Sequence, residues 1–228
     1  MPEHTCAPAL FFDFDNTITL GDVLDRVIEA YSASESWREW EAEWQAGRMS
    51  TIECLRRQVA DLRATPEELR RFMSQVRIDP DFPRIVAWAA ANESDLRILS
   101  DNFSPLIAAI LHQHGLSIVP VYANDLIFAE GRFEARFPFR DPTCVRCAHC
   151  KAQHLRITAS RPRVYVGDGL SDVCPSLVAD VVFAKDSLAA ELRRRGVPFW
   201  HYGSLGDVLR YLEDARLPIG DGLVLPAT

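Results

Sequence analysis

Two pairs of aspartates stand where short apolar segments end. The first pair, Asp13 and Asp15, follows an apolar run that ends in two phenylalanines, and the second pair, Asp168 and Asp172, follows Val164–Val166. Residues i and i+2 of a strand point to the same side, so the first two carboxylates can converge on one small volume. Adjacent carboxylates repel each other unless a divalent cation neutralises them, and hard oxygen ligands suit Mg²⁺.

Both apolar runs have the composition of buried strands. Whether the two pairs of aspartates lie close together depends on the elements around these strands. Gly167 and Gly169 flank Asp168 and permit a tight turn and a close approach to a ligand. In open α/β sheets, ligands bind outside the carboxyl ends of the strands. We therefore expect both pairs to face one crevice, with Asp172 in the first turn of the next helix. An acidic junction between a strand and a turn is the alternative for either pair taken alone.

The rest of the chain predicts an α/β fold. Strands alternate with helices from Leu96 onward, which favours a three-layer, Rossmann-like parallel sheet. Residues 21–89 have helical periodicity, and Ser50 with Glu53 and Thr65 with Glu68 are capping-box patterns that begin two of the helices. The predicted division is an α/β core of residues 1–20 and 90–228 with an inserted helical cap of residues 21–89.

Asp13-Phe14-Asp15-Asn16-Thr17 resembles the first motif of the haloacid dehalogenase superfamily, and residues 167–172 resemble its fourth motif. Ser100, which follows an apolar strand, and Lys151 occupy the places of the second and third motifs. All four motifs occur in order and cover nearly the whole chain, which makes the combination far more specific than any one motif. The helical insertion after the first motif resembles the C1-type cap of the phosphoserine-phosphatase-like members.

This resemblance implies a phosphatase that works through an aspartyl-phosphate. It makes Asp13 the nucleophile and Asp15 the general acid and base. It also implies Mg²⁺ bound by Asp13, Asp15 and Asp168 with help from Asp172, and phosphate bound by Ser100, Asp101, Asn102, Lys151 and Thr17. Taken alone, Ser100 could equally cap a turn, and Lys151 could be a solvated lysine at a helix start.

Within the superfamily, the chain most resembles the enol-phosphate phosphatase of methionine salvage and the phosphoethanolamine/phosphocholine phosphatases. Asp101 and Asn102 stand where many phosphoserine phosphatases carry glycines, and this departure argues against a simple phosphoserine substrate. Asp22 occupies the place of an acidic substrate contact, although it could equally be a carboxylate at a helix N-terminus. Phosphotransfer to an acceptor other than water and a non-catalytic, metal-binding or regulatory module are the alternative functions.

A second cluster could bind a different metal. Cys144, Cys147 and Cys150 have C-x2-C-x2-C spacing, and His154 follows four residues after the last cysteine. Thiolates and imidazole at these spacings could hold structural Zn²⁺, and the run also resembles an iron–sulfur ligand pattern. The alternative is a loop that happens to hold three thiols.

Composition limits the partners. The net charge is −7 over 228 residues, and the sequence has no basic stripe of the size that nucleic acid binding requires. The first apolar run is too short to span a bilayer. We therefore expect a cytoplasmic enzyme that acts on a small phosphorylated metabolite, without a nucleic-acid or membrane partner.

Overall fold

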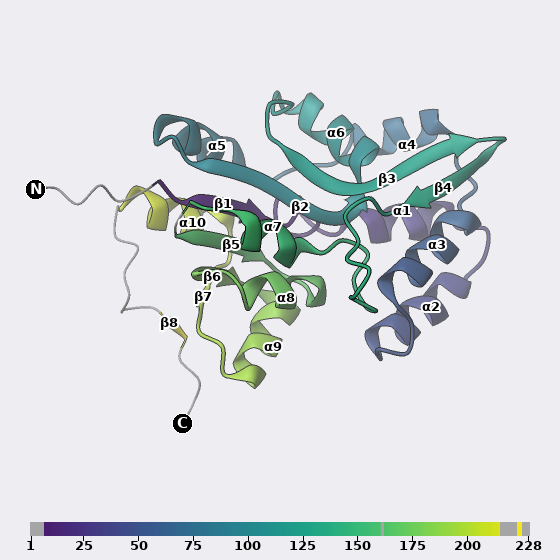
Figure 1. Cartoon of the computed structure of the whole chain (residues 1–228). Helices are drawn as coiled ribbons and strands as arrows, with labels where there is room; N and C mark the ends of the chain where they lie inside the picture. Colours follow the sequence, from purple (N-terminus) through teal and green to yellow (C-terminus); the bar gives the residue numbers. More distant parts are fainter. Residues whose placement is uncertain (1–6, 161, 215–222, 225–228) are drawn as a thin grey trace, which may run out of the picture. The chain divides into compact units, whose positions relative to one another are not determined.

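The computed structural model describes residues 7–160, 162–214 and 223–224, and the chain forms two compact units (Figure 1). The first unit contains residues 1–20, 78–99 and 151–228, and the second contains residues 21–77 and 100–150. Both units therefore draw on separate stretches of the sequence. The division into a core of residues 1–20 and 90–228 and a cap of residues 21–89 stays a prediction.

The first unit contains a mostly parallel sheet with the strand order β2-β1-β5-β6-β7-β8. Its β2 begins here and runs on into the second unit. The strands are β1 (Ala9–Phe12), β2 (Asp95–Phe103), β5 (Arg163–Gly167), β6 (Val181–Ala184), β7 (Phe199–His201) and β8 (Leu223–Val224). Strand β1 is central, because Ala9 pairs in parallel register with Asp95 on one side and Arg163 on the other. Among the strand pairs of this unit that the structure describes, β7–β8 alone is antiparallel.

Helices cover both faces of this sheet. They are α5 (Phe82–Ala91), α7 (Lys151–Ile157), α8 (Val173–Ser176), α9 (Asp186–Arg195) and α10 (Leu205–Glu213), with a 3₁₀ turn at Leu170–Asp172. Helix α5 connects β1 to β2, whereas α8 and α9 connect strands that follow one another in the opposite direction. Right-handed crossovers then place α5 on one face and α8 and α9 on the other. The predicted three-layer α/β fold is confirmed.

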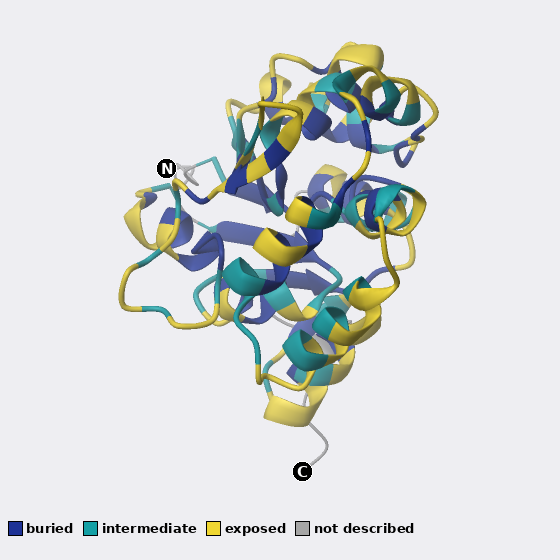
Figure 2. Ribbon diagram, turned by 90° about the vertical axis from the view of Figure 1, so that its right-hand side faces the viewer, coloured by how far each residue is buried: buried dark blue, intermediate teal, exposed yellow. Residues whose placement is uncertain are grey.

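Apolar residues explain why β1 occupies the centre of the sheet. All four of its residues are fully buried, and the Phe12 ring packs edge-on against Phe82 of α5, with centroids 5.7 Å apart. On the other face, a cluster of buried side chains from α8, α9, β6 and β7 includes Leu188, Leu192 and Phe199. Figure 2 shows these strands as buried, with exposed residues on the outer sides of the helices. The carboxyl end of β1 is thus held in place inside the unit by packing on both faces of the sheet.

The second unit is built from helices and a hairpin. Its elements are α1 (Val23–Tyr31), α2 (Ser36–Gln45), α3 (Thr51–Asp61), α4 (Pro66–Met73), α6 (Ser104–Gln113), β3 (Val121–Ala129), β4 (Arg132–Arg136) and the end of β2. The predicted capping signals are present. The Thr65 side chain accepts a hydrogen bond from the Glu68 backbone while the Glu68 side chain accepts from the Thr65 backbone, and Ser50 caps α3.

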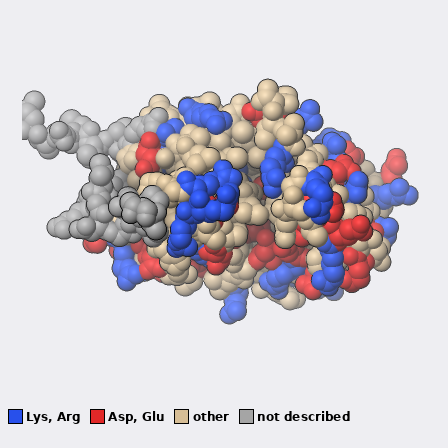
Figure 3. Space-filling model, turned by 90° about the horizontal axis from the view of Figure 1, so that it is seen from below, with Lys and Arg blue, Asp and Glu red and all other residues tan. Residues whose placement is uncertain are grey.

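Charged side chains of both signs share the surface. Lys and Arg are interspersed with Asp and Glu on the face drawn in Figure 3. Several charged residues in the described part of the chain form ion pairs within one helix, such as Glu191 with Arg194 and Arg195 on α9. None of the helices in the described part of the chain is both long and apolar enough to cross a bilayer.

Candidate active site

The end of β1 delivers Asp13 into the interior of the first unit. The Asp13 backbone N–H donates to the Val166 carbonyl over 2.9 Å, so the parallel ladder with β5 continues through this residue. Its side chain is 8 % exposed. After Asp13 the chain turns sharply, because the Phe14 carbonyl accepts hydrogen bonds from the backbone N–H groups of Thr17 and the two residues after it. This turn brings Asn16 and Thr17 back toward the end of β5.

Lys151, the first residue of α7, lies buried between two carboxylates. Its Nζ is 2.6 Å from Asp13 Oδ1 and 2.7 Å from Asp172 Oδ1, and it also donates to Ser171 Oγ over 3.3 Å. The lysine side chain is 1 % exposed. A buried ammonium is tolerated only where it is paired, so these contacts fix both the lysine and the two acids.

Asp172 receives a full set of hydrogen-bond donors. Its Oδ1 accepts from Lys151 Nζ and from the Tyr165 hydroxyl at 2.6 Å, and its Oδ2 accepts from the backbone N–H groups of Asp168 and Gly169, both at 3.1 Å. Each oxygen thus has two donors. Asp172 acts as a fixed strut between β5, the turn after it and Lys151.

Gly167 makes room for that strut. A Cβ on Gly167 would lie 2.5 Å from Asp172 Oδ2 and 2.7 Å from its Cγ, which is closer than real Cβ contacts. A Cβ on Gly169 would meet nothing closer than 3.9 Å. The first glycine of the Gly-Asp-Gly turn is therefore required by packing, and the second is not.

Asp168 is held by the loop that follows β1. Its Oδ1 accepts from Thr17 Oγ1 over 3.1 Å, and its Oδ2 accepts from Asn16 Nδ2 over 2.8 Å. Its backbone carbonyl accepts from the Leu188 N–H at 2.7 Å. The loop after β1 therefore fixes the Asp168 carboxylate, and the segment after β6 fixes its backbone carbonyl.

The electrostatics of the site disfavour ionised carboxylates. Burial, followed by the charge of Asp172, raises the pKa of Asp13 well above its usual value, and Lys151 opposes this shift. The same two causes raise the pKa of Asp168, against the hydrogen bonds from Asn16 and Thr17. A divalent cation would relieve the burial and repulsion that these carboxylates experience when ionised.

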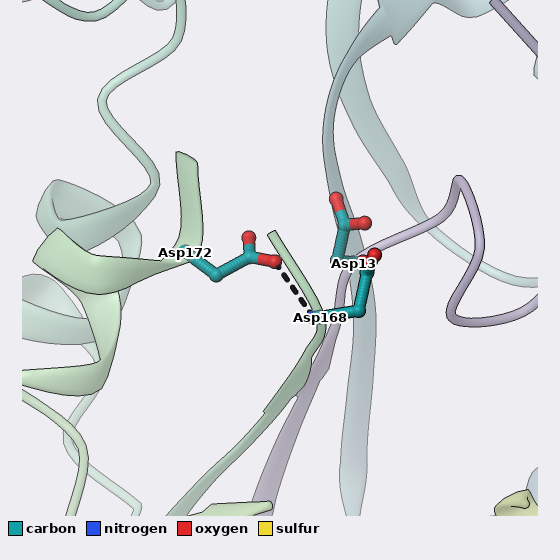
Figure 4. A group of neighbouring side chains, drawn as sticks. All are labelled: Asp13, Asp168 and Asp172. Atoms are coloured by element: carbon teal, nitrogen blue, oxygen red, sulfur yellow. Dashed lines mark hydrogen bonds between the residues drawn. The ribbon is translucent and has the colours of Figure 1, made fainter. Parts of the chain in front are cut away.

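The donor set fits such a cation. One ligand atom from each of Asp13, Asp168 and Asp172 lies within 4.8 Å of the others. Figure 4 shows the carboxylates of Asp13 and Asp168 side by side, while Asp172 turns toward the Asp168 backbone. Asp13 Oδ1 and each oxygen of Asp168 accept one hydrogen bond, and Asp13 Oδ2 accepts none within the described residues. Each oxygen of Asp172 accepts two. Asp13 and Asp168 are thus suited to bind the metal directly, and Asp172 to orient them.

The comparisons with known proteins agree with this geometry. Residues 10–174 match the family model of the haloacid dehalogenase-like hydrolases. The chain belongs to this family. The predicted family is therefore confirmed, and the matched segment contains Asp13, Asp15, Ser100, Lys151 and Asp168.

Relatives of this haloacid dehalogenase-like hydrolase are named as phosphatases. The chain is 26 % identical to a 2-hydroxy-3-keto-5-methylthiopentenyl-1-phosphate phosphatase of Brevibacillus brevis, over 91 % of this chain and 96 % of the relative. It is 24 % identical to a polyol phosphate phosphatase of Saccharomyces cerevisiae, over 88 % and 90 %. A solved structure of phosphoserine phosphatase, an analogue of its phospho-aspartyl intermediate, superposes with a TM-score of 0.70 at 18 % identity, over 90 % and 99 %. The predicted likeness to the methionine-salvage enzyme and to phosphoserine phosphatases is confirmed.

The remaining predicted phosphate ligands lie in the second unit of the hydrolase. Ser100 is 1 % exposed, and its Oγ accepts from the Asn102 backbone N–H at 3.0 Å. Asp101 Oδ1 accepts from the His149 backbone N–H at 3.1 Å, and His149 Nδ1 contacts the Ser100 carbonyl at 3.0 Å. Asp101, one of the two residues that stand where many relatives carry glycines, thus binds the segment just before Lys151. That these residues join the carboxylates in one site stays a prediction.

Asp22 and the cysteine cluster have other surroundings. Asp22 caps α1 by accepting from the Asp25 N–H at 2.8 Å, and its role as a substrate contact stays a prediction. The Cys147 N–H donates to Cys144 Sγ over 3.4 Å, and no disulfide joins the described cysteines. The three aspartates form the one group of potential metal ligands that converges within the described residues. A second metal at the cysteines with His154 therefore gains no support.

Sequence reasoning missed two buried tyrosines and Asp186. Tyr165 donates to Asp172, and the Tyr202 hydroxyl lies between Thr17 Oγ1 at 3.4 Å and the Gly167 carbonyl at 3.3 Å. Burial raises the pKa of both phenols well above the usual value.

Proposed function

We propose that this hydrolase is a Mg²⁺-dependent phosphatase that cleaves the phosphate monoester of a small metabolite through an aspartyl-phosphate. One observation carries the proposal: Asp13 is a buried carboxylate with Oδ1 held by Lys151 at 2.6 Å and Oδ2 without a hydrogen bond in the described residues. A carboxylate oxygen that is fixed in position and still has its lone pairs is suited to act as a nucleophile.

The residues of the first loop would perform both half-reactions. Asp13 Oδ2 forms a bond to phosphorus as the bond from phosphorus to the ester oxygen breaks. Asp15, which is half-buried, gives its proton to the departing alkoxide oxygen. Water then attacks the phosphorus of the aspartyl-phosphate and releases Asp13. Asp15 takes the proton from this water, which restores the starting state.

The charges around the nucleophile would make this attack feasible. When bound by Asp13, Asp168 and the Asp15 backbone, Mg²⁺ would offset the repulsion between a carboxylate and a phosphate dianion. Lys151 holds Asp13 in place and supplies a positive charge beside it. Thr17 orients Asp168, and Asp172 keeps Lys151 and the turn after β5 in register.

Phosphate binding would extend to the second motif. The Ser100 hydroxyl accepts a hydrogen bond from Asn102, so its own proton remains available for a phosphoryl oxygen. At Asp101 the donor would be the backbone N–H, because the Asp101 carboxylate binds His149. Asn102 would act by holding the Ser100 hydroxyl in place through its own backbone N–H. Asp22 would contact the substrate head group while it caps α1.

The substrate class is supported by the relatives. Their names include 2-hydroxy-3-keto-5-methylthiopentenyl-1-phosphate, polyol phosphates and phosphoserine, all small phosphorylated metabolites. We place residues 21–89 as the cap that would select among such esters. We also place the enzyme in the cytoplasm, since no disulfide joins the described cysteines.

The test is phosphate release from an aryl phosphate and from a panel of phosphorylated metabolites, with Mg²⁺ and with EDTA. We expect turnover that requires Mg²⁺ and falls by at least about 10³-fold in Asp13→Asn. The matched control is Asp214→Asn, an exposed aspartate at the end of α10. Phosphate from a radiolabelled substrate should appear on the wild-type chain after acid quenching and be absent from Asp13→Asn.

Three results would overturn the proposal. Folded wild type that binds Mg²⁺ but releases no phosphate from any ester would exclude a general phosphatase. Full activity in Asp13→Asn would exclude the aspartyl-phosphate mechanism. Transfer of label to an added alcohol in preference to water would replace hydrolysis with phosphotransfer.

A further inference from the structure

One amide joins two carboxylates next to the proposed metal site. Asn16 Nδ2 donates to Asp168 Oδ2 at 2.8 Å and to Asp186 Oδ2 at 3.0 Å. Asn16 lies in the loop after β1, and Asp186 is the first residue of α9, directly after β6. We refer to the contacts Asp168–Asn16–Asp186 as the amide bridge. Asp186 was not among the predicted site residues.

The bridge uses the full donor capacity of one side chain. A primary amide has two N–H groups on Nδ2, and here each one faces a carboxylate oxygen. If Asp186 were absent, the Asn16 amide could rotate away from Asp168. With both partners present, the plane of the amide is fixed, and it fixes one oxygen of Asp168 in turn. Thr17 holds the other oxygen, so the carboxylate cannot rotate freely.

The backbone supports the same interpretation. Four described residues other than glycine have a left-handed backbone, and two of them are Asn16 at φ 52° and Asp186 at φ 45°. This region costs most residues roughly 1 kcal/mol or more, although Asn and Asp tolerate it best. Two such residues meet in one hydrogen-bonded chain beside Asp168. Leu188 N–H and Ser187 Oγ, from the same turn as Asp186, donate to the Asp168 carbonyl at 2.7 and 3.2 Å.

We propose that Asn16 and Asp186 are positioning residues that orient the Asp168 carboxylate for a divalent cation. Asp186, although exposed, acts on the metal only through Asn16. This inference rests on the metal site of the proposed function but not on the reaction, because its readout is cation binding in the absence of substrate.

Because both residues have a left-handed backbone, each side chain can be removed by substitution with glycine without straining the backbone. Asn16→Gly and Asp186→Gly remove the side chains while keeping a residue that accepts φ > 0. Partners that orient metal ligands change affinity by about 10–100-fold when they are removed. We therefore expect Asn16→Gly to weaken Mn²⁺ binding by about 10–100-fold, measured by electron paramagnetic resonance and by calorimetry on the full chain. We expect Asp186→Gly to weaken it by about 5–10-fold.

Two further variants separate the bridge from simple charge. Asp186→Asn keeps an oxygen acceptor and removes the charge, so it should retain most of the affinity. Glu191→Gln removes one negative charge from a half-buried position of α9, where it pairs with Arg194 and Arg195, and should leave binding unchanged. If Asp186→Asn and Asp186→Gly lost equal affinity for Mn²⁺, the proposal would be wrong, and the effect would come from the negative charge of Asp186 acting at a distance.

The double variant is the decisive measurement. If Asp186 acts through Asn16, then Asn16→Gly/Asp186→Gly should bind Mn²⁺ no more weakly than Asn16→Gly alone. Losses that multiply would overturn the proposal. Thermal melting of each variant shows whether it is folded, and Asp168→Asn confirms that the observed cation occupies this site. Wild type that binds no cation overturns the inference, whereas wild type that binds Mn²⁺ without hydrolysing esters rejects only the phosphatase function.

Discussion

The carboxylates of the first unit and the cysteines of the second unit both have spacings that suit metal ligands. Among the residues that the structure describes, only the carboxylates form a group whose ligand atoms converge. Asp13, Asp168 and Asp172 come from segments about 150 residues apart and offer ligand atoms within 4.8 Å of one another. Cys144, Cys147 and Cys150 lie within seven residues of sequence and form no such group within the described residues. Closeness in sequence was therefore a weaker predictor of a metal site than position at the ends of neighbouring strands.

The difference has a structural cause. The aspartates follow neighbouring parallel strands, and the register between β1 and β5 fixes where those strands end. The cysteines occupy irregular chain between β4 and α7. The spacing of potential ligands indicates a metal site when strands or helices hold the side chains at one place. Without such elements, the spacing shows only that the side chains are close enough in sequence to bind one metal.

The largest expected effect comes from removing the ammonium group of Lys151, which holds two of the carboxylates in place. Lys151→Met leaves two buried acids, Asp13 and Asp172, without their shared partner. Breaking a buried ion pair from one side typically costs about 3–5 kcal/mol. We expect a loss of this size in the free energy of unfolding, measured by urea denaturation in EDTA, and loss of activity. Lys185→Met is the control, because Lys185 is half-buried and lies over the Tyr202 ring. Equal losses in both variants would contradict the special role of Lys151.

His154, the predicted fourth partner of the cysteines, provides the next test. Burial, followed by the charge of Arg97, lowers the pKa of His154 to about 4. The unfolded chain has a histidine pKa of about 6.5, so it binds more protons than the folded chain between these values. This contribution to stability is complete above about pH 6.5 and is lost as the pH falls toward 4, by up to about 3 kcal/mol.

We therefore expect His154→Gln to lose less stability than wild type between pH 7 and pH 4.5, measured by chemical denaturation. His201→Gln, at an exposed position, should follow the wild-type curve. If zinc instead shifted the melting temperature of wild type and not that of His154→Gln, His154 would be a ligand and the contrast between the two clusters would disappear.

The glycines of the turn after β5 test how tightly the carboxylates are packed. Gly167→Ala places a Cβ 2.5 Å from Asp172 Oδ2, so the strut must move. We expect a loss of about 1–3 kcal/mol in stability and about 10–100-fold in kcat/KM. Gly169→Ala is the matched control, since its Cβ would meet nothing within 3.9 Å and its φ is −109°. Equal stability and equal kcat/KM in the two variants would show that the turn adapts to the added Cβ and that Asp172 can move.

The smallest effect is expected at the cysteines. The double variant Cys144→Ser/Cys147→Ser should change stability by no more than about 0.5 kcal/mol, as surface substitutions do. The purified wild type should contain less than stoichiometric zinc by elemental analysis. Stoichiometric zinc that is lost in the double variant would reverse the comparison and make the cysteine loop a second metal centre.

The sequence was sufficient for the family, the fold and the main acids, because each of these leaves a local pattern. Apolar strands ending in aspartates predicted where Asp13 and Asp168 lie, and capping signals predicted the start of α4 at Pro66. Asp186 left no such pattern, since its role depends on a contact with Asn16 across 170 residues. Tyr165 read as one more apolar residue of a buried strand, and only coordinates show its hydroxyl against Asp172.

The central position of β1 also has a consequence for synthesis. Asn16 is 152 residues from its partner Asp168, and the β5 edge of β1 stays unpaired until that region has been made. At about 5–20 residues per second, the ribosome needs roughly 8–30 s for this interval. During that time the fully apolar segment Ala9–Phe12 has no β5 to cover it. The nascent chain should therefore depend on chaperones early, and a pulse-labelled N-terminal fragment should bind them more strongly than the completed enzyme.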